Sequence, residues 1–95
     1  MPSYLVEVYL SQSRAHEARA IAGRARDAAE QLSAEGVPIR HVRTTFLPDD
    51  ETCFHLFEAA SAEAVEEVSR RAVLGRARIV PAIEASRPAR RRATE

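Results

Sequence analysis

The chain has 95 residues, 45% of them hydrophobic, and its 14 arginines balance its 14 acidic residues, while lysine is absent. This length supports one hydrophobic core, and a single cysteine excludes an internal disulfide. Residues 1–85 carry ten arginines against thirteen acidic residues, so the folded part is mildly acidic and is not expected to bind nucleic acid through a basic face.

A β-branched and aromatic run predicts the first strand over residues 4–10. One face of this strand is apolar, and the other carries Leu5, Glu7 and Tyr9. Alanine and aliphatic residues then recur at helical spacing, from a cap at Ser11 or Ser13 to a stop at Gly36. A strand followed by a helix of about five turns is therefore predicted.

Two further strands are predicted over residues 39–47 and 52–58, joined by a tight acidic loop at residues 48–50. In each, alternation makes one face apolar. The other faces carry His41, Arg43, Cys53 and His55. These side chains can ligate a metal, titrate or donate hydrogen bonds, so they indicate a site on the sheet face away from the core.

Ser61 caps a second predicted helix that ends at Gly75, and a last strand is predicted over residues 78–84, with Pro81 marking it as an edge strand. The resulting order βαββαβ is that of ferredoxin-like α+β domains. We expect residues 1–85 to form a four-stranded antiparallel sheet with two helices on one face. Right-handed crossovers give the strand order four-one-three-two.

The pairing of the second and third strands depends on loop length. A five-residue loop places Arg43 opposite His55 and Thr45 opposite Cys53, whereas a four-residue loop reverses the faces. With the longer loop, the unusual side chains share the open face with two residues of the first strand, Glu7 and Tyr9. In a dimer joined by its sheets, that face would line an enclosed cavity.

The pattern Cys-Phe-x-Leu-x-Glu-Ala at residues 53–59 resembles a family of small bacterial proteins, common in actinobacteria and described as nickel-binding. The similar segments are residues 2–10, 51–59, 61–65 and 78–84. The resemblance implies a ferredoxin-like fold that forms a homodimeric α/β barrel, with metal binding as its activity.

The candidate metal ligands differ from those that the resemblance implies, because the histidines expected from it are missing. The stretches that correspond to the first strand and the second helix, residues 7–10 and 68–72, contain no histidine. Imidazole, thiolate and carboxylate suit Ni²⁺, Zn²⁺ or Cu²⁺. His41 and His55 are the candidate ligands, with Cys53 and Glu7 nearby, and the alternative is that both histidines are partly buried and hydrogen-bonded.

Three functions compete for these residues. The leading one is a homodimeric ligand- or metal-binding protein whose cavity is lined by Tyr9, His41, Arg43, Cys53 and His55. The second is an enzyme in which His55 is a general base oriented by Glu7, while Tyr9 or Arg43 polarises a substrate oxygen. The third is a purely structural or regulatory dimer.

The last ten residues, 86–95, carry four arginines without apolar periodicity, and we expect them to be disordered. No charged and apolar leader opens the chain, and its apolar runs are far shorter than the ~20 residues that span a bilayer. We therefore expect a cytoplasmic protein with no membrane partner.

Overall fold

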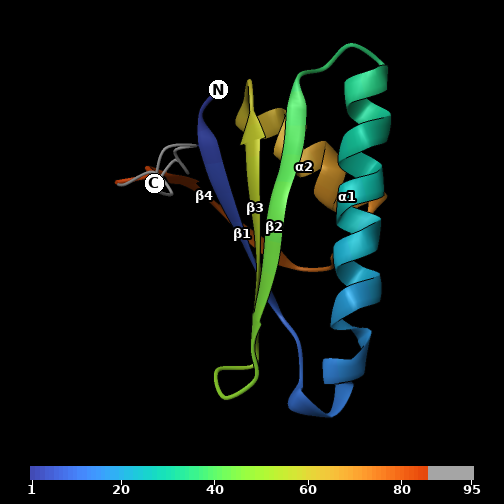
Figure 1. Cartoon of the computed structure of the whole chain (residues 1–95), viewed down its shortest axis with the longest axis vertical. Helices are drawn as coiled ribbons and strands as arrows, with labels where there is room; N and C mark the ends of the chain where they lie inside the picture. The colour runs from blue at the N-terminus through green and yellow to red at the C-terminus, as the bar shows by residue number, and fades with distance from the viewer. Residues whose placement is uncertain (86–95) are drawn as a thin grey trace, which may run out of the picture.

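The computed structural model describes residues 1–85, and the arginine-rich segment 86–95 lies outside them. The elements in chain order are β1 (Ser3–Tyr9), the 3-10 helix η1 (Gln12–Glu17), α1 (Ala18–Ala34), β2 (Ile39–Leu47), β3 (Thr52–Ala59), α2 (Ala62–Arg71) and β4 (Ala77–Ala82). The strands form one antiparallel sheet in the order β2-β3-β1-β4. Both α-helices lie on the same face of it (Figure 1). The predicted α+β ferredoxin-like fold and strand order are confirmed.

The segment before α1 differs from the single long helix expected from the sequence. The Ser11 side chain caps it by accepting a hydrogen bond from the Ser13 N–H at 3.3 Å. The following turns are 3-10, and Arg14 has non-helical angles of φ −110° and ψ 17°. The α-helix therefore starts only at Ala18, and it ends before Gly36, whose φ of +99° supplies the expected stop.

Helix α2 is also shorter than expected. Its N-terminus is capped as predicted, because the Ser61 hydroxyl accepts from the Ala64 N–H at 3.3 Å. The helix ends at Arg71, before Gly75, because Val73 already adopts a left-handed φ of +54°. No helix in residues 1–85 is long and apolar enough to cross a bilayer.

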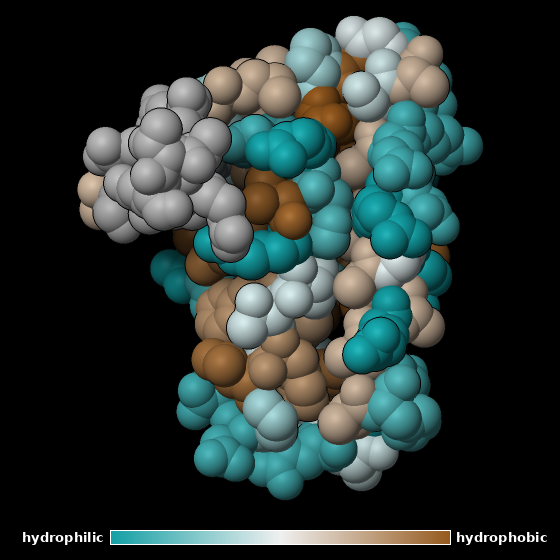
Figure 2. All heavy atoms as spheres, viewed as in Figure 1, coloured by the Kyte–Doolittle hydropathy of each residue, from teal (hydrophilic) through white to brown (hydrophobic). Residues whose placement is uncertain are grey.

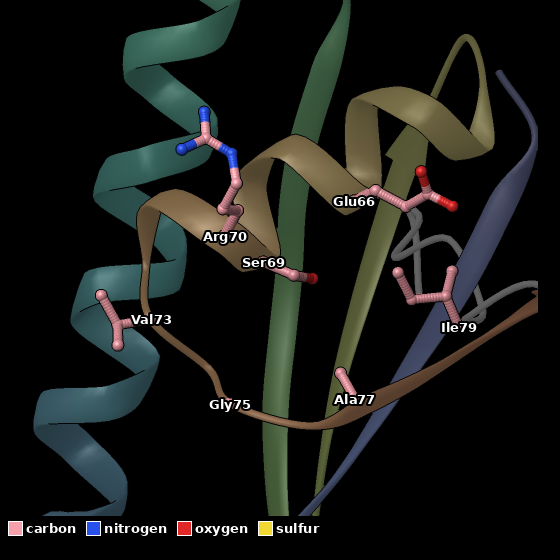
Figure 3. Close-up of a pocket in the computed structure, with 7 residues that line it drawn as sticks. All are labelled: Glu66, Ser69, Arg70, Val73, Gly75, Ala77 and Ile79. Carbon is pink, nitrogen blue, oxygen red and sulfur yellow. The ribbon is translucent and has the colours of Figure 1, made fainter.

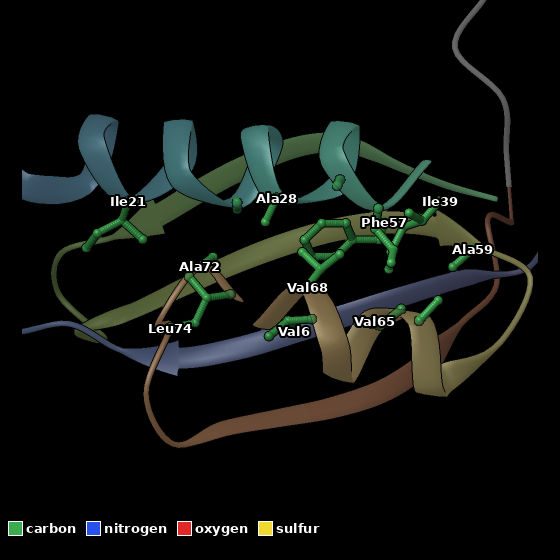
Figure 4. Packing of buried hydrophobic residues seen from close by; sticks show 14 of the residues in the cluster. Val6, Ile21, Ala28, Ile39, Phe57, Ala59, Val65, Val68, Ala72 and Leu74 are labelled. Atoms are coloured by element: carbon green, nitrogen blue, oxygen red, sulfur yellow. The ribbon is translucent and has the colours of Figure 1, made fainter. Parts of the chain in front are cut away.

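The core fills the layer between the sheet and the two helices (Figure 4). Its fully buried side chains include Val6 of β1, Phe57 of β3, and Val65 and Val68 of α2, each 0% exposed. Each such side chain contributes roughly 1.5–3 kcal/mol by leaving water. Helix α1 adds small and aliphatic residues at helical spacing, namely Ile21, Ala25, Ala28, Ala29 and Leu32. Its alanines let the helix approach the sheet closely.

The β2–β3 hairpin has the shorter of the two loops considered above, with Leu47 paired to Thr52 across four turn residues. Near this turn Thr44 lies opposite His55 and Phe46 lies opposite Cys53. The pairing expected from a five-residue loop was therefore wrong.

An irregularity lies further along the same pair of strands. The register shifts by one between His41 and Arg43, as at a β-bulge, so Arg43 lies opposite Leu56. The shift places Val42 as the extra residue of β2. It also decides which side chains of β2 face the helices.

Candidate functional site

Strand β3 directs its two unusual side chains into the core, toward the helices. Cys53 is 1% exposed and His55 is 0% exposed, and both alternate with Phe54 and Leu56 on the opposite face. The expectation that Cys53 and His55 lie on the open face was therefore wrong. The physical reason is that both faces of this strand are apolar, so alternation alone does not say which face the helices cover.

Four side chains, two buried (Cys53 and His55) and two partly buried (His41 and Thr44), form a hydrogen-bonded series, called here the polar chain. The Thr44 hydroxyl lies 2.7 Å from Nδ1 of His55 and 2.8 Å from Nε2 of His41. The Cys53 sulfur lies 3.7 Å from Nε2 of His55. Both ring nitrogens of His55 are thus occupied by partners inside the protein.

All three contacts of the polar chain can form with every member neutral, in either of two proton arrangements. In one, the Cys53 S–H donates to His55, the His55 Nδ1–H donates to Thr44, and the Thr44 O–H donates to His41. In the other, the His41 Nε2–H donates to Thr44, the Thr44 O–H donates to Nδ1 of His55, and the His55 Nε2–H donates to the Cys53 sulfur. A proton could pass between His41 and Cys53 only by switching the whole series.

Burial keeps the members of the polar chain uncharged near neutral pH. It lowers the pKa of His55 to about 4, and the charge of Arg24 and the charge that His41 carries when protonated act in the same direction. It lowers the pKa of His41 as well, helped by the charge of Arg26, and raises the pKa of the Cys53 thiol. The thiol is therefore poorly suited to nucleophilic chemistry.

The remaining predicted site residues lie on the uncovered face of the sheet, called here the open face. The Glu7 carboxylate pairs with Arg78 of β4, Oε2 to Nη1, at 3.0 Å. Tyr9 is 67% exposed, and Arg43 is exposed on β2. The sheet therefore separates the six predicted residues into two groups of three, and the prediction that they line one cavity was wrong.

The separation bears directly on the general-base hypothesis. Glu7 lies on the open face, so it does not orient His55, whose ring is closed off from solvent. A general base must come within hydrogen-bond reach of a substrate proton, directly or through one water. The geometry of His55 gives catalysis by this residue no support.

Metal binding is supported no better by the geometry. Residues 1–85 contain no group of three or more His, Cys, Asp or Glu side chains that could hold an ion. The Thr44 hydroxyl bonds to both His41 and His55 and so occupies the place between their rings. The residues present in one chain therefore do not fit a nickel ion.

A groove of about 760 Å³ crosses one end of the open face, and we call it the sheet groove. Val42 and Leu56 provide apolar surface in it, and Arg43 stands beside them. The space-filling view shows hydrophobic surface between hydrophilic groups over the strands (Figure 2). The lining comes from β2, β3, β1 and the segment around β4, so the groove runs across the sheet.

Charges are distributed unevenly along the sheet groove. At the β2 end, the Arg40 guanidinium is neutralised by Glu58, Nη2 to Oε1, at 2.8 Å. Arg43 at the same end makes no ion pair within residues 1–85, and neither does Glu84 beyond the far end of β4. The β2 end therefore carries an available positive charge.

Thr44 and the sheet groove were both missed from the sequence. His41 and Thr44 are three residues apart, which puts two side chains on opposite faces of a regular strand. They meet on the helix side because the bulge between them adds a residue. No feature of the sequence marks this bulge. The apolar pair Phe54 and Leu56 was the available signal for the groove, because it shows that the outer face of β3 is apolar too.

Comparison with known proteins gave no match to a family model, a curated protein or a solved structure. The resemblance to the nickel-binding family therefore stays a prediction. The class that the structure defines is an α+β ferredoxin-like domain with one covered and one open sheet face. Its polar chain lies on the covered side, and the sheet groove lies on the open side.

Proposed function

We propose that this chain is a small homodimeric binding protein that takes an elongated molecule with a carboxylate or phosphate end in the sheet groove. The observation that carries the proposal is the groove itself, in which the unpaired Arg43 stands beside apolar surface from Val42 and Leu56. Ligand sites are concave and mostly apolar, with a few polar groups that fix orientation. The sheet groove is concave and combines apolar surface with the charged residues Arg40, Arg43, Glu58 and Glu84.

Arg43 is the group that would recognise the acidic end of the ligand. Guanidinium binds carboxylate and phosphate through two parallel hydrogen bonds. Arg40 stands on the same strand but is already paired with Glu58, so it would support the site without supplying a free charge. The apolar part of the ligand would lie over Leu56, toward β1 and β4.

The open face also supports self-association. Leu5, Phe54 and Val80 occupy this face and are only partly buried in a single chain. No helix in residues 1–85 covers them (Figure 1). A second copy packed sheet to sheet would bury these residues and close the sheet groove over its ligand.

Octanoate and octan-1-ol form a matched pair of probes, since they share an alkyl chain and differ in the charged end. Titration followed by amide chemical shifts should show octanoate shifting residues of the sheet groove and binding more tightly than the alcohol. The variant Arg43→Gln should weaken octanoate binding about tenfold, the value of one charge-assisted hydrogen bond, and leave octanol binding unchanged.

Arg19→Gln is the control, because Arg19 is exposed on α1, away from the groove. It should bind both probes as the unaltered protein does. The ligand part of the proposal would be refuted if Arg43→Gln bound octanoate with unchanged affinity, or if octanoate shifted only residues outside the groove.

A further inference from the structure

The outer edge of β4 carries backbone groups that no described strand uses. β4 is the last strand in the order β2-β3-β1-β4, and within residues 1–85 nothing pairs with its far side. Proline is accepted in a sheet where its missing N–H faces away from the neighbouring strand, as at Pro81. Peptide groups at alternate residues point to the same side. Ala77 and Ile79 therefore also direct their N–H and C=O groups outward.

The same two residues line a groove of about 380 Å³ between β4 and α2, called here the edge groove. Figure 3 shows β4 along one side of it and α2 along the other. The lining residues are Glu66, Ser69, Arg70, Val73, Gly75, Ala77 and Ile79. Side chains that project from a strand added to β4, opposite Ala77 and Ile79, would enter this groove.

Ser69 supplies a second, independent indication of a ligand. The residue is 8% exposed, and its buried hydroxyl oxygen has no hydrogen-bond partner among the described residues. Figure 3 shows this hydroxyl pointing into the space between α2 and β4. A buried hydroxyl without a partner costs stability. It would gain a partner if a polar side chain entered the edge groove.

The rim of the edge groove favours a basic group. Arg70 is neutralised by Glu67, Nε to Oε1, at 3.2 Å, so it offers no free positive charge. Glu66 makes no ion pair within the described part of the chain. Glu66 is therefore the lining residue that offers an available charge, and that charge is negative.

We propose that the β4 edge and the edge groove together bind an extended peptide segment of a partner protein, which adds to the sheet as a fifth strand. Main-chain hydrogen bonds to Ala77 and Ile79 would hold it, and a serine or threonine side chain would bond to Ser69. A basic residue of the peptide would face Glu66. This surface is separate from the sheet groove, so the two proposals succeed or fail independently.

Selection of random heptapeptides displayed on phage against the full-length protein tests the proposal. Enriched peptides should contain a serine or threonine with a basic residue nearby. When synthesised and added to labelled protein, they should shift the amides of Ala77, Ile79 and Ser69. Failure of any sequence to enrich would overturn the proposal, as would shifts confined to other elements. Concentration-dependent shifts of Ser69 and the β4 edge without peptide, and without shifts of Leu5 and Phe54 on the open face, would also overturn it, in favour of a second copy at this edge.

Methylation of single peptide nitrogens tests the strand geometry. A methyl group on the residue opposite Ile79 should weaken binding at least tenfold, because it removes a main-chain donor and blocks the approach of the strand. Methylation of the next residue, whose N–H points away from β4, should change affinity less than twofold. Equal effects at the two positions would rule out strand addition.

Ser69→Ala separates a binding role from a structural one. Removal of the unpartnered hydroxyl should raise the urea midpoint of the free protein, yet weaken peptide binding at least fivefold. Ser33→Ala, at an exposed position of α1, is the matched control and should change neither quantity. Unchanged affinity in Ser69→Ala would contradict the proposed contact and overturn the proposal.

Discussion

At the scale of single residues, the polar chain depends on one hydroxyl. Thr44 bonds to both His41 and His55, at 2.8 and 2.7 Å. The variant Thr44→Val keeps the shape of the side chain but leaves two imidazole nitrogens without this partner. An unsatisfied buried polar group costs roughly 1–3 kcal/mol. We expect urea unfolding to show a loss of this size.

Thr45→Val is the matched control, since the next residue of β2 is exposed on the other face. Surface substitutions of this kind usually change stability by less than about 0.5 kcal/mol. If both variants lost the same amount, the Thr44 hydroxyl would not bridge the two rings.

The polar chain also makes stability depend on pH. His55 has a folded-state pKa lowered to about 4, while an unfolded histidine titrates near its ordinary pKa of about 6.5. The unfolded chain therefore binds more protons between these values, so the stability is lost as pH falls and is fully present only above about pH 6.5. The lowered pKa of His41 acts in the same direction.

Urea unfolding between pH 7 and pH 5 should show a loss of roughly 2 kcal/mol from His55 alone. This window lies above the titration of the paired carboxyl groups of Glu17, Glu35 and Glu67, whose pKa values are lowered. His16→Gln, an exposed control on η1, should show the same change in the free energy of unfolding between pH 7 and pH 5. A stability that stays flat over this range would contradict the burial of neutral His55.

The identity of the polar residues was more predictable than their position. The sequence singled out His41, Cys53 and His55 on adjacent strands, and the structure joins all three in one hydrogen-bonded series. Their face was not predictable, because Phe54 and Leu56 make the second face of β3 as apolar as the first. Which face is covered depends on the helices, and that is a property of the whole fold.

At the scale of elements, the order of strands and helices was predictable because the period of apolar residues switches clearly along the chain. The residues at which the elements begin and end were less predictable. A one-residue bulge in β2 and a four-residue turn after Leu47 set the register, and both are small choices of backbone geometry. The early end of α2 has the same origin, since Val73 leaves the helix before Gly75.

The end of α2 provides a prediction about strain. Val73 is 72% exposed and holds a φ of +54°, a conformation that costs a side chain with a Cβ about 1–2 kcal/mol. Val73→Gly should therefore raise the free energy of unfolding by about 1 kcal/mol, after the added freedom of the unfolded glycine is subtracted. Thermal or urea unfolding measures the change.

Val73→Ala is the comparison for this strain, because alanine keeps the Cβ. It should recover less stability than glycine does. If glycine proved no better than alanine at this position, the left-handed conformation would not be the source of strain, and loss of the exposed valine side chain would explain any effect.

At the scale of the whole molecule, the two faces of the sheet differ in what covers them. The helix-covered face holds the core and the polar chain, and these stabilise the fold without contacting solvent at His55. The open face keeps apolar residues such as Leu5 and Phe54 partly accessible. A single chain of this size buries only part of its apolar surface, and a partner surface would bury the apolar residues that the helices leave uncovered.

The proposed sheet-to-sheet homodimer gives the last prediction. Val80 lies opposite Leu5 on the open face, on the edge strand β4, where a single chain buries it only partly. Val80→Glu should leave the monomer folded but place an unpaired charge in the dimer interface, which costs several kcal/mol. Sedimentation equilibrium should then show a dimer for the unaltered protein and a monomer for the variant. Arg19→Glu, on the helix side of the molecule, makes a larger change in charge, −2 against −1, away from the open face and should remain dimeric. About 200 µM is far above the micromolar Kd at the weak end of the range for standard-size interfaces. The dimer would be refuted if the unaltered protein were monomeric at this concentration. The octanoate titration would still decide separately whether the sheet groove binds acids.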